Sequence, residues 1–159
     1  VGDYAQGGIV FYVDESGRHG LVAATNDLET SFSWGCEGQS INGAGYLALS
    51  TGYFNSQDIM GFCHEEDIAA RACDIYKNDG YDDWYLPSID ELIEMNYSIG
   101  LFSQIDNIAA FDTSTNSPSH ISSSEASPSS CYSYQTEFDN PNRNFPKSWS
   151  AKVRPIRSF

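Results

Sequence analysis

The chain is poor in basic residues and has no long apolar run. Its 159 residues include 8 Lys and Arg against 22 Asp and Glu, a formal net charge of −14. That charge repels nucleic-acid phosphates and anionic lipid, so we expect no nucleic-acid partner. No stretch is apolar over the length that a bilayer requires, so we expect no direct membrane insertion.

Several chemical signatures are also missing. The sequence has no Cys-x-x-Cys pair, which disfavours a zinc knuckle or a thioredoxin-type redox site. It has no G-x-S-x-G, Walker or Rossmann pattern, and His19, His64 and His120 form no zincin motif. We therefore expect no cofactor and no enzyme activity, although a Ser-His-Asp triad stays open in so Ser-rich a chain.

What the chain does contain suits one packed domain over residues 1–159. Hydrophobic residues make up 40% and aromatic residues 14%, enough for a core built largely of rings. Low Lys, high Ser, Asn and Tyr, and 4 cysteines favour an extracellular protein. The sequence starts at Val1 without an initiator Met, so we expect it to be the C-terminal part of a longer surface or fibre protein.

Charge is unevenly distributed along the chain. Residues 120–159 carry a net charge of +2, so the preceding residues carry −16. The aromatic and polar tract CYSYQTEFDNPNRNFPKSW, residues 131–149, lies in this less acidic part. A partner surface there would differ in charge from the rest of the molecule.

The first part of the chain predicts a hairpin and a loop. Residues 9–13 and 21–24 are β-rich, and DESGRHG between them has turn chemistry. Residues 34–56 are Gly-rich and lack a period, so we expect an ordered loop there.

The middle and end predict two helices and short strands. Apolar residues recur at helical spacing over 68–76, preceded by HEED and followed by NDG. Ser88 and Glu91 have the spacing of a capping box, and Ile89, Leu92 and Ile93 would form an apolar face. Together these features predict the second helix. A Ser-rich segment begins at Asp112, and the sequences HISSSE, CYSYQTEF and KVRPIRSF predict strands. The order predicts an α+β fold with two helices beside a mostly antiparallel sheet and long irregular loops.

Several motifs in this order resemble a bacterial domain of unknown function. They are GGIVFYVDESGRHGLVAA, WGC, IAARAC, GYDDWYLPSIDEL, SSSE and VRPIRSF, which span nearly the whole chain. That family is related to the C-terminal domain of a collagen-like bacterial adhesin. The resemblance implies a C-type-lectin-like fold and a recognition module on a bacterial cell surface, a pilus tip or a phage tail fibre. Its partner would be a host or cell-surface protein or a glycan.

The same fold carries the variable proteins of diversity-generating retroelements, in which adenine-directed mutagenesis rewrites Asn codons. Such mutagenesis cannot yield Lys, Glu, Gln, Met or Trp, and residues 126–134 and 139–146 contain none of these. The chain also departs from the family here, with His120 and Ile121 in place of an aromatic pair and CYSY in place of an Ala-Trp-Tyr-like stretch. A diversified face and a plain variable loop both stay open.

The tract 131–149 mixes rigid aromatic rings with adaptable polar side chains, as antibody loops do. Alternation places Tyr132 and Tyr134 on one strand face, which is either core or ligand surface, whereas residues 139–149 are aperiodic and predict a binding loop. The predicted ligand-facing residues are His120, Ile121, Tyr132, Tyr134, Asn140, Asn142, Arg143, Asn144, Phe145 and Trp149.

Two other functions stay open. One is an enzyme of the formylglycine-generating type, which shares the broad fold and would use Cys or Ser chemistry near a histidine. The other is a structural fibre cap, which would bury Tyr132, Tyr134 and Phe145.

Charged residues outside the tract allow further predictions. Arg154 and Arg157 in the last predicted strand are expected to form structural ion pairs with the acidic part of the chain. Asp79, Asp82 and Asp83 could hold calcium, but their spacing fits no EF-hand loop and Asp is common in caps and turns.

The cysteines allow three pairings, among which the sequence does not decide. We predict a Cys36–Cys63 disulfide, because these residues flank the Gly-rich loop and their bond would pin it. Cys73 lies on the first helical stripe, and if Cys131 is a product of diversification we expect it to lack a partner.

Overall fold

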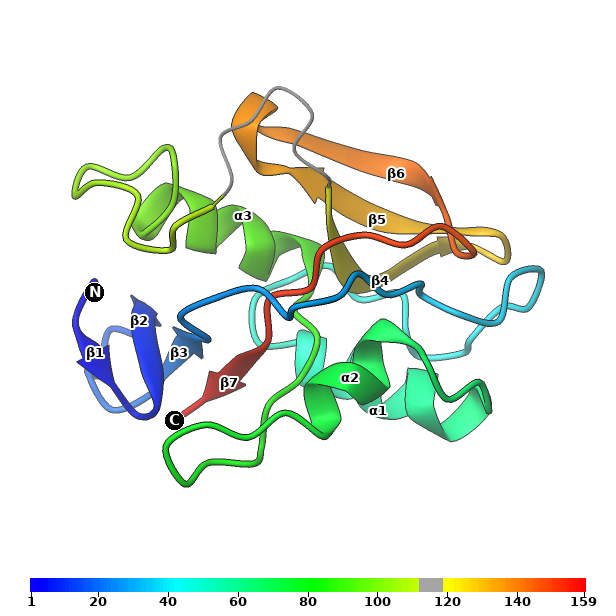
Figure 1. The fold of residues 1–159 in the computed structure, drawn as a ribbon, viewed down its shortest axis with the longest axis horizontal. Helices are drawn as coiled ribbons and strands as arrows, with labels where there is room; N and C mark the ends of the chain where they lie inside the picture. Colours follow the sequence, from blue (N-terminus) through cyan, green and yellow to red (C-terminus); the bar gives the residue numbers. More distant parts are fainter. Residues whose placement is uncertain (112–118) are drawn as a thin grey trace.

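Two antiparallel sheets and three α-helices make up the computed structural model, which describes residues 1–111 and 119–159 (Figure 1). One sheet has the order β1 (Tyr4–Ala5), β2 (Gly8–Val13), β3 (Gly20–Ala23), β7 (Ile156–Ser158). The other has the order β4 (His120–Ser127), β5 (Ser130–Gln135), β6 (Asn140–Pro146). The helices are α1 (Gly52–Phe62), α2 (Ala69–Asp74) and α3 (Ile89–Ser98), and a 3-10 turn η1 (Thr136–Phe138) joins β5 to β6. The α+β class is confirmed, with one more sheet and one more helix than predicted.

The predicted N-terminal hairpin is present as β2 and β3, and the end of the chain completes its sheet. Val22 of β3 lies opposite Arg157 of β7, and the Gly20 and Phe159 backbones exchange two hydrogen bonds of 3.0 and 3.1 Å. Both ends of the described chain therefore lie at this end of the molecule (Figure 1).

The two outer edges of the second sheet differ in their backbone hydrogen bonding. The free edge of β4 is covered by loops, since Ile121 donates to the Lys152 carbonyl and Glu125 to the Ala44 carbonyl. Among the described residues, no backbone hydrogen bond joins the outer edge of β6 to another segment. β6 is the open edge of this sheet. The Ser-rich segment that leads into β4 lies partly, over 112–118, outside the described residues.

Helix α1 begins within the predicted Gly-rich loop, residues 34–56, and continues past its end to Phe62. Its buried residues Gly52, Asn55, Ser56 and Ile59 have helical spacing, but three of them are not apolar. The expected stripe of large apolar residues is therefore absent, and Tyr53, Phe54 and Phe62 face outward instead. Asn55 can be buried because its side chain bonds the Tyr46 backbone twice and the Ser123 hydroxyl.

Helix α2 confirms the first predicted helix but is shorter, since it ends at Asp74 and not at the NDG sequence. Asn78–Tyr81 instead form a separate tight turn with reciprocal backbone hydrogen bonds, in which Asp79 and Gly80 have positive φ. The acidic HEED residues lie before the helix, because Ile68 is its N-cap.

Helix α3 begins with the predicted capping box. The Ser88 hydroxyl accepts a hydrogen bond from the Glu91 backbone N–H (3.3 Å), and Glu91 Oε2 accepts one from the Ser88 N–H (2.7 Å). Ile89 and Leu92 are buried as predicted, and Ile93 is half-buried against the same core. Local signals therefore set where this helix begins, and bonds from Ser88 to Ala48 and from Ile89 to Ser124 fix it to other segments.

The predicted structural roles of Arg154 and Arg157 are confirmed. Arg154 Nε donates to Asp27 Oδ1 (2.7 Å), and its guanidinium also donates to the carbonyls of Ala24 and Ala109. Arg157 holds Asp83 through two hydrogen bonds of 2.6 and 2.9 Å. Both pairs join the basic end of the chain to its acidic part.

We expect Glu91 to make stability depend on pH. Burial raises the pKa of the Glu91 carboxyl from 4.5 to about 7. Between these values the unfolded chain releases this proton while the folded chain keeps it, so stability falls as pH rises from 4.5 to 7. The loss should approach about 3 kcal/mol at 1.36 kcal/mol per pKa unit.

Urea unfolding of the wild type and of Glu91→Gln across pH 4–8 measures this effect. Gln keeps a capping-box acceptor but does not titrate, so its curve should lack the fall. Glu94→Gln on the same helix is the control and should keep the wild-type profile. Parallel curves for wild type and Glu91→Gln would contradict the assignment.

Candidate functional site

The predicted ligand-facing residues fall into three environments. His120, Ile121, Tyr134 and Phe145 are buried, Tyr132 and Asn142 are half-buried, and Asn140, Arg143, Asn144 and Trp149 are exposed. Only the last two groups can touch a ligand in this structure, so the predicted surface is narrower than expected.

His120 and Ile121 belong to the core, which corrects their prediction as ligand contacts. His120 Nε2 lies 3.0 Å from Asp27 Oδ1, and its ring meets Phe111 edge-on at 4.9 Å between centroids. Ile121 is fully buried in the cluster that packs against α1 and α2. Both side chains are buried because each packs against a face that other segments cover, Phe111 and Asp27 for His120 and the α1 and α2 cluster for Ile121.

Tyr134 is likewise a core residue. It is fully buried, its hydroxyl donates to Asp139 Oδ1 (2.5 Å), and it accepts a hydrogen bond from Asn96 Nδ2 (3.1 Å). Tyr132 packs against the same apolar cluster while remaining half-exposed. The sequence left open whether Tyr132 and Tyr134 belong to the core or to the ligand surface. Tyr134 belongs to the core, and Tyr132 belongs to it in part.

Phe145 and Trp149 form a pair with one inner and one outer member. Phe145 is buried, whereas the Trp149 side chain is 63% exposed and packs against it edge-on at 5.9 Å between ring centroids. Phe145 is thus corrected to a supporting residue. Trp149 is an exposed ring held by a buried one.

Residues 140–146, predicted as an aperiodic loop, are strand β6. Cys131 pairs with Phe145 and Ser133 with Asn142, so both Arg143 and Asn144 lie opposite the single residue Tyr132. This β-bulge breaks the alternation that would have revealed a strand. It also presents two neighbouring polar side chains beside a half-exposed tyrosine.

Within the described residues, the Arg143 guanidinium has no ion-pair partner. The Asn142 side chain is occupied with the backbone, since its Oδ1 accepts a hydrogen bond of 2.9 Å from the Asn144 N–H. We define the β6 surface as Tyr132, Asn140, Arg143, Asn144 and Trp149. It can offer donors, acceptors and aromatic faces to a ligand.

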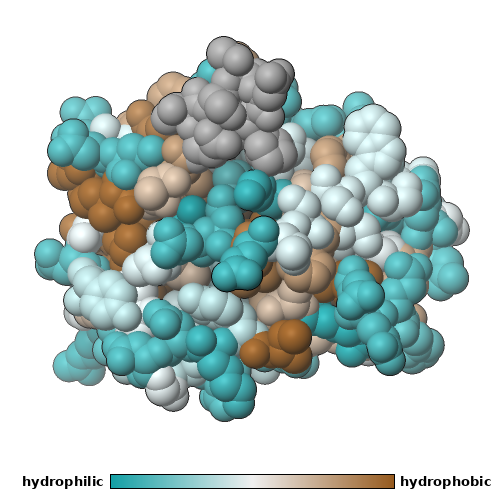
Figure 2. Space-filling view, in the orientation of Figure 1, coloured by the Kyte–Doolittle hydropathy of each residue, from teal (hydrophilic) through white to brown (hydrophobic). Residues whose placement is uncertain are grey.

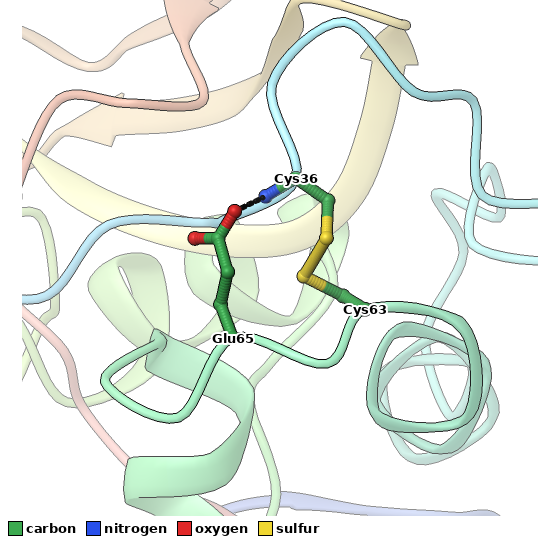
Figure 3. Close-up of side chains that lie close together, drawn as sticks. All are labelled: Cys36, Cys63 and Glu65. Carbon is green, nitrogen blue, oxygen red and sulfur yellow. Dashed lines mark hydrogen bonds between the residues drawn. A yellow bond between two sulfur atoms is a disulfide. The ribbon is translucent and has the colours of Figure 1, made fainter.

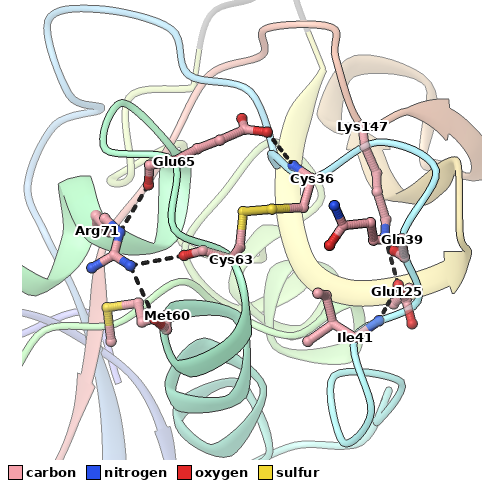
Figure 4. The surroundings of a disulfide bond; sticks show 9 residues. All are labelled: Cys36, Gln39, Ile41, Met60, Cys63, Glu65, Arg71, Glu125 and Lys147. Carbon is pink, nitrogen blue, oxygen red and sulfur yellow. Dashed lines mark hydrogen bonds and ion pairs between the residues drawn. A yellow bond between two sulfur atoms is a disulfide. The ribbon is translucent and has the colours of Figure 1, made fainter.

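A buried ion pair lies at the end of β6 (Figure 4). Lys147, which follows β6, is fully buried; its Nζ lies 2.5 Å from Glu125 Oε1 and 2.7 Å from the Gln39 carbonyl. The ammonium also lies 4.2 Å from the centroid of the Trp34 ring. Glu125 in turn accepts a hydrogen bond from the Ile41 N–H (2.9 Å). One lysine thus joins β4, the end of β6 and the loop 34–41.

The predicted disulfide Cys36–Cys63 is present and pins the same loop to the end of α1 (Figure 3). Glu65 Oε1 accepts a hydrogen bond of 2.9 Å from the Cys36 N–H. These three residues are the one cluster of possible metal ligands among the described residues. Because the two sulfurs are bonded to each other, they offer no thiolate, and we assign the cluster a structural role.

The three calcium candidates, Asp79, Asp82 and Asp83, have other roles in the structure. Asp83 bonds Arg157, Asp82 Oδ2 lies 3.6 Å from Lys77 Nζ, and Asp79 lies in the turn described above. Cation partners already balance two of these carboxylates. A turn or an ion pair therefore accounts for each of them.

In the described residues, no hydrogen bond joins a histidine ring to a serine hydroxyl or a cysteine thiol. Cys73 and Cys131 are free and buried, and burial raises the pKa of both thiols, that of Cys131 to about 12. Such thiols stay protonated and are poor nucleophiles. His19 lines a cavity of about 400 Å³ that also contains Ser50 and Ser158, but no hydrogen bond joins its ring to either hydroxyl.

Comparison with known proteins places the chain in no family. No protein-family model matches it, and no curated protein matches its sequence. In the part of the chain that the structure describes, no helix has the length and apolar character to cross a membrane.

Sequence reasoning missed Lys147 and Glu125. Charged residues are rarely buried unless they are paired, and nothing local marks these two as partners. Their separation of 22 residues gives no periodic signal. The tract 131–149 also contains Glu137, Asp139 and Arg143, so the presence of a lysine there is no distinguishing signal.

We predict that breaking this pair strongly destabilises the domain. Lys147→Met leaves the Glu125 carboxylate buried without its cation and should cost about 3–5 kcal/mol. The double variant Lys147→Met/Glu125→Gln should be less destabilised than the sum of the single variants, because no unpaired charge remains. Urea unfolding of all three variants measures the coupling.

The exposed pair Lys77–Asp82, with side chains 72% and 70% exposed, is the matched control. Lys77→Met should change stability by less than about 1 kcal/mol. Additive effects at positions 147 and 125 would show that the pair contributes no coupling energy.

Proposed function

We propose that this domain is an extracellular recognition module that binds a protein or glycan through the β6 surface. The observation that carries the proposal is the β-bulge, which sets Arg143 and Asn144 side by side, exposed and opposite Tyr132. An arginine without an ion-pair partner among the described residues retains its hydrogen-bonding capacity for a ligand.

The composition of the surface supports recognition over an inert role. Exposed Trp, Tyr and Arg are the side chains enriched where proteins bind one another, and Asn adds adaptable hydrogen bonds. Trp149 contacts Phe145 edge-on, and most of its surface remains exposed to a ligand. The fibre-cap alternative expects Tyr132, Tyr134 and Phe145 all to be buried; Tyr134 and Phe145 are, and Tyr132 is only partly buried.

Recognition here uses side chains and not strand addition. An open edge strand normally offers backbone N–H groups to an added strand. β6 includes Pro141 and Pro146, which lack that group, and its bulge distorts the edge between them. The edge is thereby protected from pairing while its side chains stay accessible.

The proposed location and parent protein rest on the composition and on the resemblance. The Cys36–Cys63 disulfide suits an oxidising compartment and supports an extracellular site on a bacterial surface or virion. The C-type-lectin-like fold rests on the motif resemblance, with which two antiparallel sheets are compatible. The domain would then end an adhesin, a pilus tip or a tail fibre.

Diversification by a retroelement is compatible with β6 more than with β5. Asn140, Asn142, Arg143 and Asn144 are at least half-exposed, so substitutions there need not disturb the core. In contrast Cys131, Ser133 and Tyr134 of β5 are fully buried. A variable face would therefore be concentrated on β6.

To test the proposal, tetramers of the purified domain are applied to arrays of defined glycans and of purified cell-surface proteins, where avidity reveals weak binding. Arg143→Ala/Asn144→Ala should weaken binding to the strongest ligand by about tenfold or more, because both polar anchors are lost. Thermal unfolding checks that the variant remains folded.

The matched control is Arg18→Ala/Asn26→Ala, which removes the same two residue types at exposed positions outside the β6 surface. It should bind as the wild type does. Equal binding by both double variants would exclude the β6 surface, and a folded domain that binds neither array would contradict the recognition function.

A further inference from the structure

A second surface lies where residues 28–32 face α2 and the segment before it. A groove of about 410 Å³ is lined there by apolar residues and by carboxylates. The apolar lining is Leu28, Phe32, Ala72, Ile75 and Tyr76, the acidic lining is Glu29, Glu66 and Asp67, and Thr30 and Arg71 complete it. We call this the α2 groove; Figure 2 shows a hydrophobic area over α2, at the lower centre, bordered by hydrophilic side chains.

The apolar floor of the groove is unusually open to solvent. Ile75, just beyond the end of α2, is 75% exposed, more than any other large apolar residue in the described part of the chain. Leu28, Phe32 and Tyr76 are only partly buried around it. Exposed apolar side chains beside a polar rim can be covered by the apolar side chains of a partner.

The carboxylates of the rim are not neutralised. Among the described residues, Glu29, Glu66 and Asp67 form no ion pair, and all three are exposed. One cation, Arg71, also lines the groove, but within the described residues it forms no ion pair with these carboxylates. Its guanidinium donates to the carbonyls of Glu65, Met60 and Cys63 at the end of α1 (Figure 4).

The groove is held in shape before any partner arrives. One wall is fixed because Leu28 donates to the Val153 carbonyl (2.9 Å) and Phe32 to the Ala151 carbonyl (3.0 Å). The walls meet where Ala69 donates to the Ser33 carbonyl (2.8 Å). A preformed groove loses little conformational entropy on binding.

We propose that the α2 groove binds a peptide segment of a partner protein in which Lys or Arg flanks large aliphatic residues. Aliphatic side chains would cover Ile75 and Phe32, and the cations would pair with the rim carboxylates. A second copy of this chain would bring an equally acidic groove and a net charge of −14, which opposes self-association. A neutral apolar molecule would leave the rim carboxylates without partners.

The probe is a short acetylated and amidated peptide in which Lys and Leu alternate, titrated into the ¹⁵N-labelled domain. Changes in the backbone amide chemical shifts should be confined to residues 28–32 and 66–76. A Lys–Ser peptide tests for charge alone and a Glu–Leu peptide tests for apolar contact alone, and neither should bind measurably. Affinity should fall as salt rises, because the rim charges are exposed.

Two variants separate the contributions. Ile75→Ser removes the exposed aliphatic group and should weaken Lys–Leu binding by about tenfold or more. The triple variant Glu29→Gln/Glu66→Gln/Asp67→Asn should weaken it by about tenfold as well. Its control, Asp3→Asn/Glu15→Gln/Glu37→Gln, changes net charge equally at exposed sites outside the groove and should have less than about a twofold effect.

Each other outcome overturns the proposal. Equal losses in the two triple variants would show non-specific attraction to an acidic protein. Shifts that map outside the groove, or no binding, would remove the groove as a peptide site. Dimerisation of the wild type that Ile75→Ser abolishes would assign the groove to a second copy. None of these results bears on the β6 surface, which shares no residue with the groove.

Discussion

The buried ion pair between Lys147 and Glu125 is the contact on which the C-terminal half depends. Lys147 follows β6, Glu125 lies in β4, and the lysine also binds the Gln39 carbonyl in the loop that Cys36 pins. These segments cannot separate without stranding a charge that is fully buried, which costs several kcal/mol. The pair thus fixes the end of β6, an edge strand with two prolines, while the ladder with β5 holds the rest of it.

Ion pairing also accounts for the uneven distribution of charge along the sequence. The basic residues near the end of the chain face the acidic remainder, as Arg154 does with Asp27 and Arg157 with Asp83. Asp27 shows how tightly such a site is coupled: burial opposes its ionised form, but His120 and Arg154 outweigh burial and lower its pKa to about 2. Arg143 has no comparable partner among the described residues, and this distinguishes a surface arginine from the structural ones.

The predictable parts of the fold are those whose causes lie close together in sequence. The capping box of α3 and the β2–β3 hairpin each depend on a few neighbouring residues, and both were found. Helix α1 was missed because its inner face is polar and is satisfied by Tyr46 and Ser123, which lie on other segments. β6 was missed because a bulge opposite Tyr132 interrupts its alternation. For the candidate site, residue types indicated the right tract, but burial of His120 and Tyr134 depends on tertiary contacts with Asp27 and Asn96 that no local pattern encodes.

The two proposed surfaces differ in chemistry in a way that prevents them from competing. The β6 surface offers a guanidinium, amides and aromatic faces, so it suits ligands rich in hydrogen-bond acceptors. The α2 groove offers carboxylates around an apolar floor, so it suits cationic and aliphatic side chains. They are also built on separate supports, the Lys147 pair for one and the contacts of residues 28–33 with Val153, Ala151 and Ala69 for the other. Occupation of one surface therefore leaves the other available, and a basic segment in the groove would hold the domain while β6 engages its own ligand.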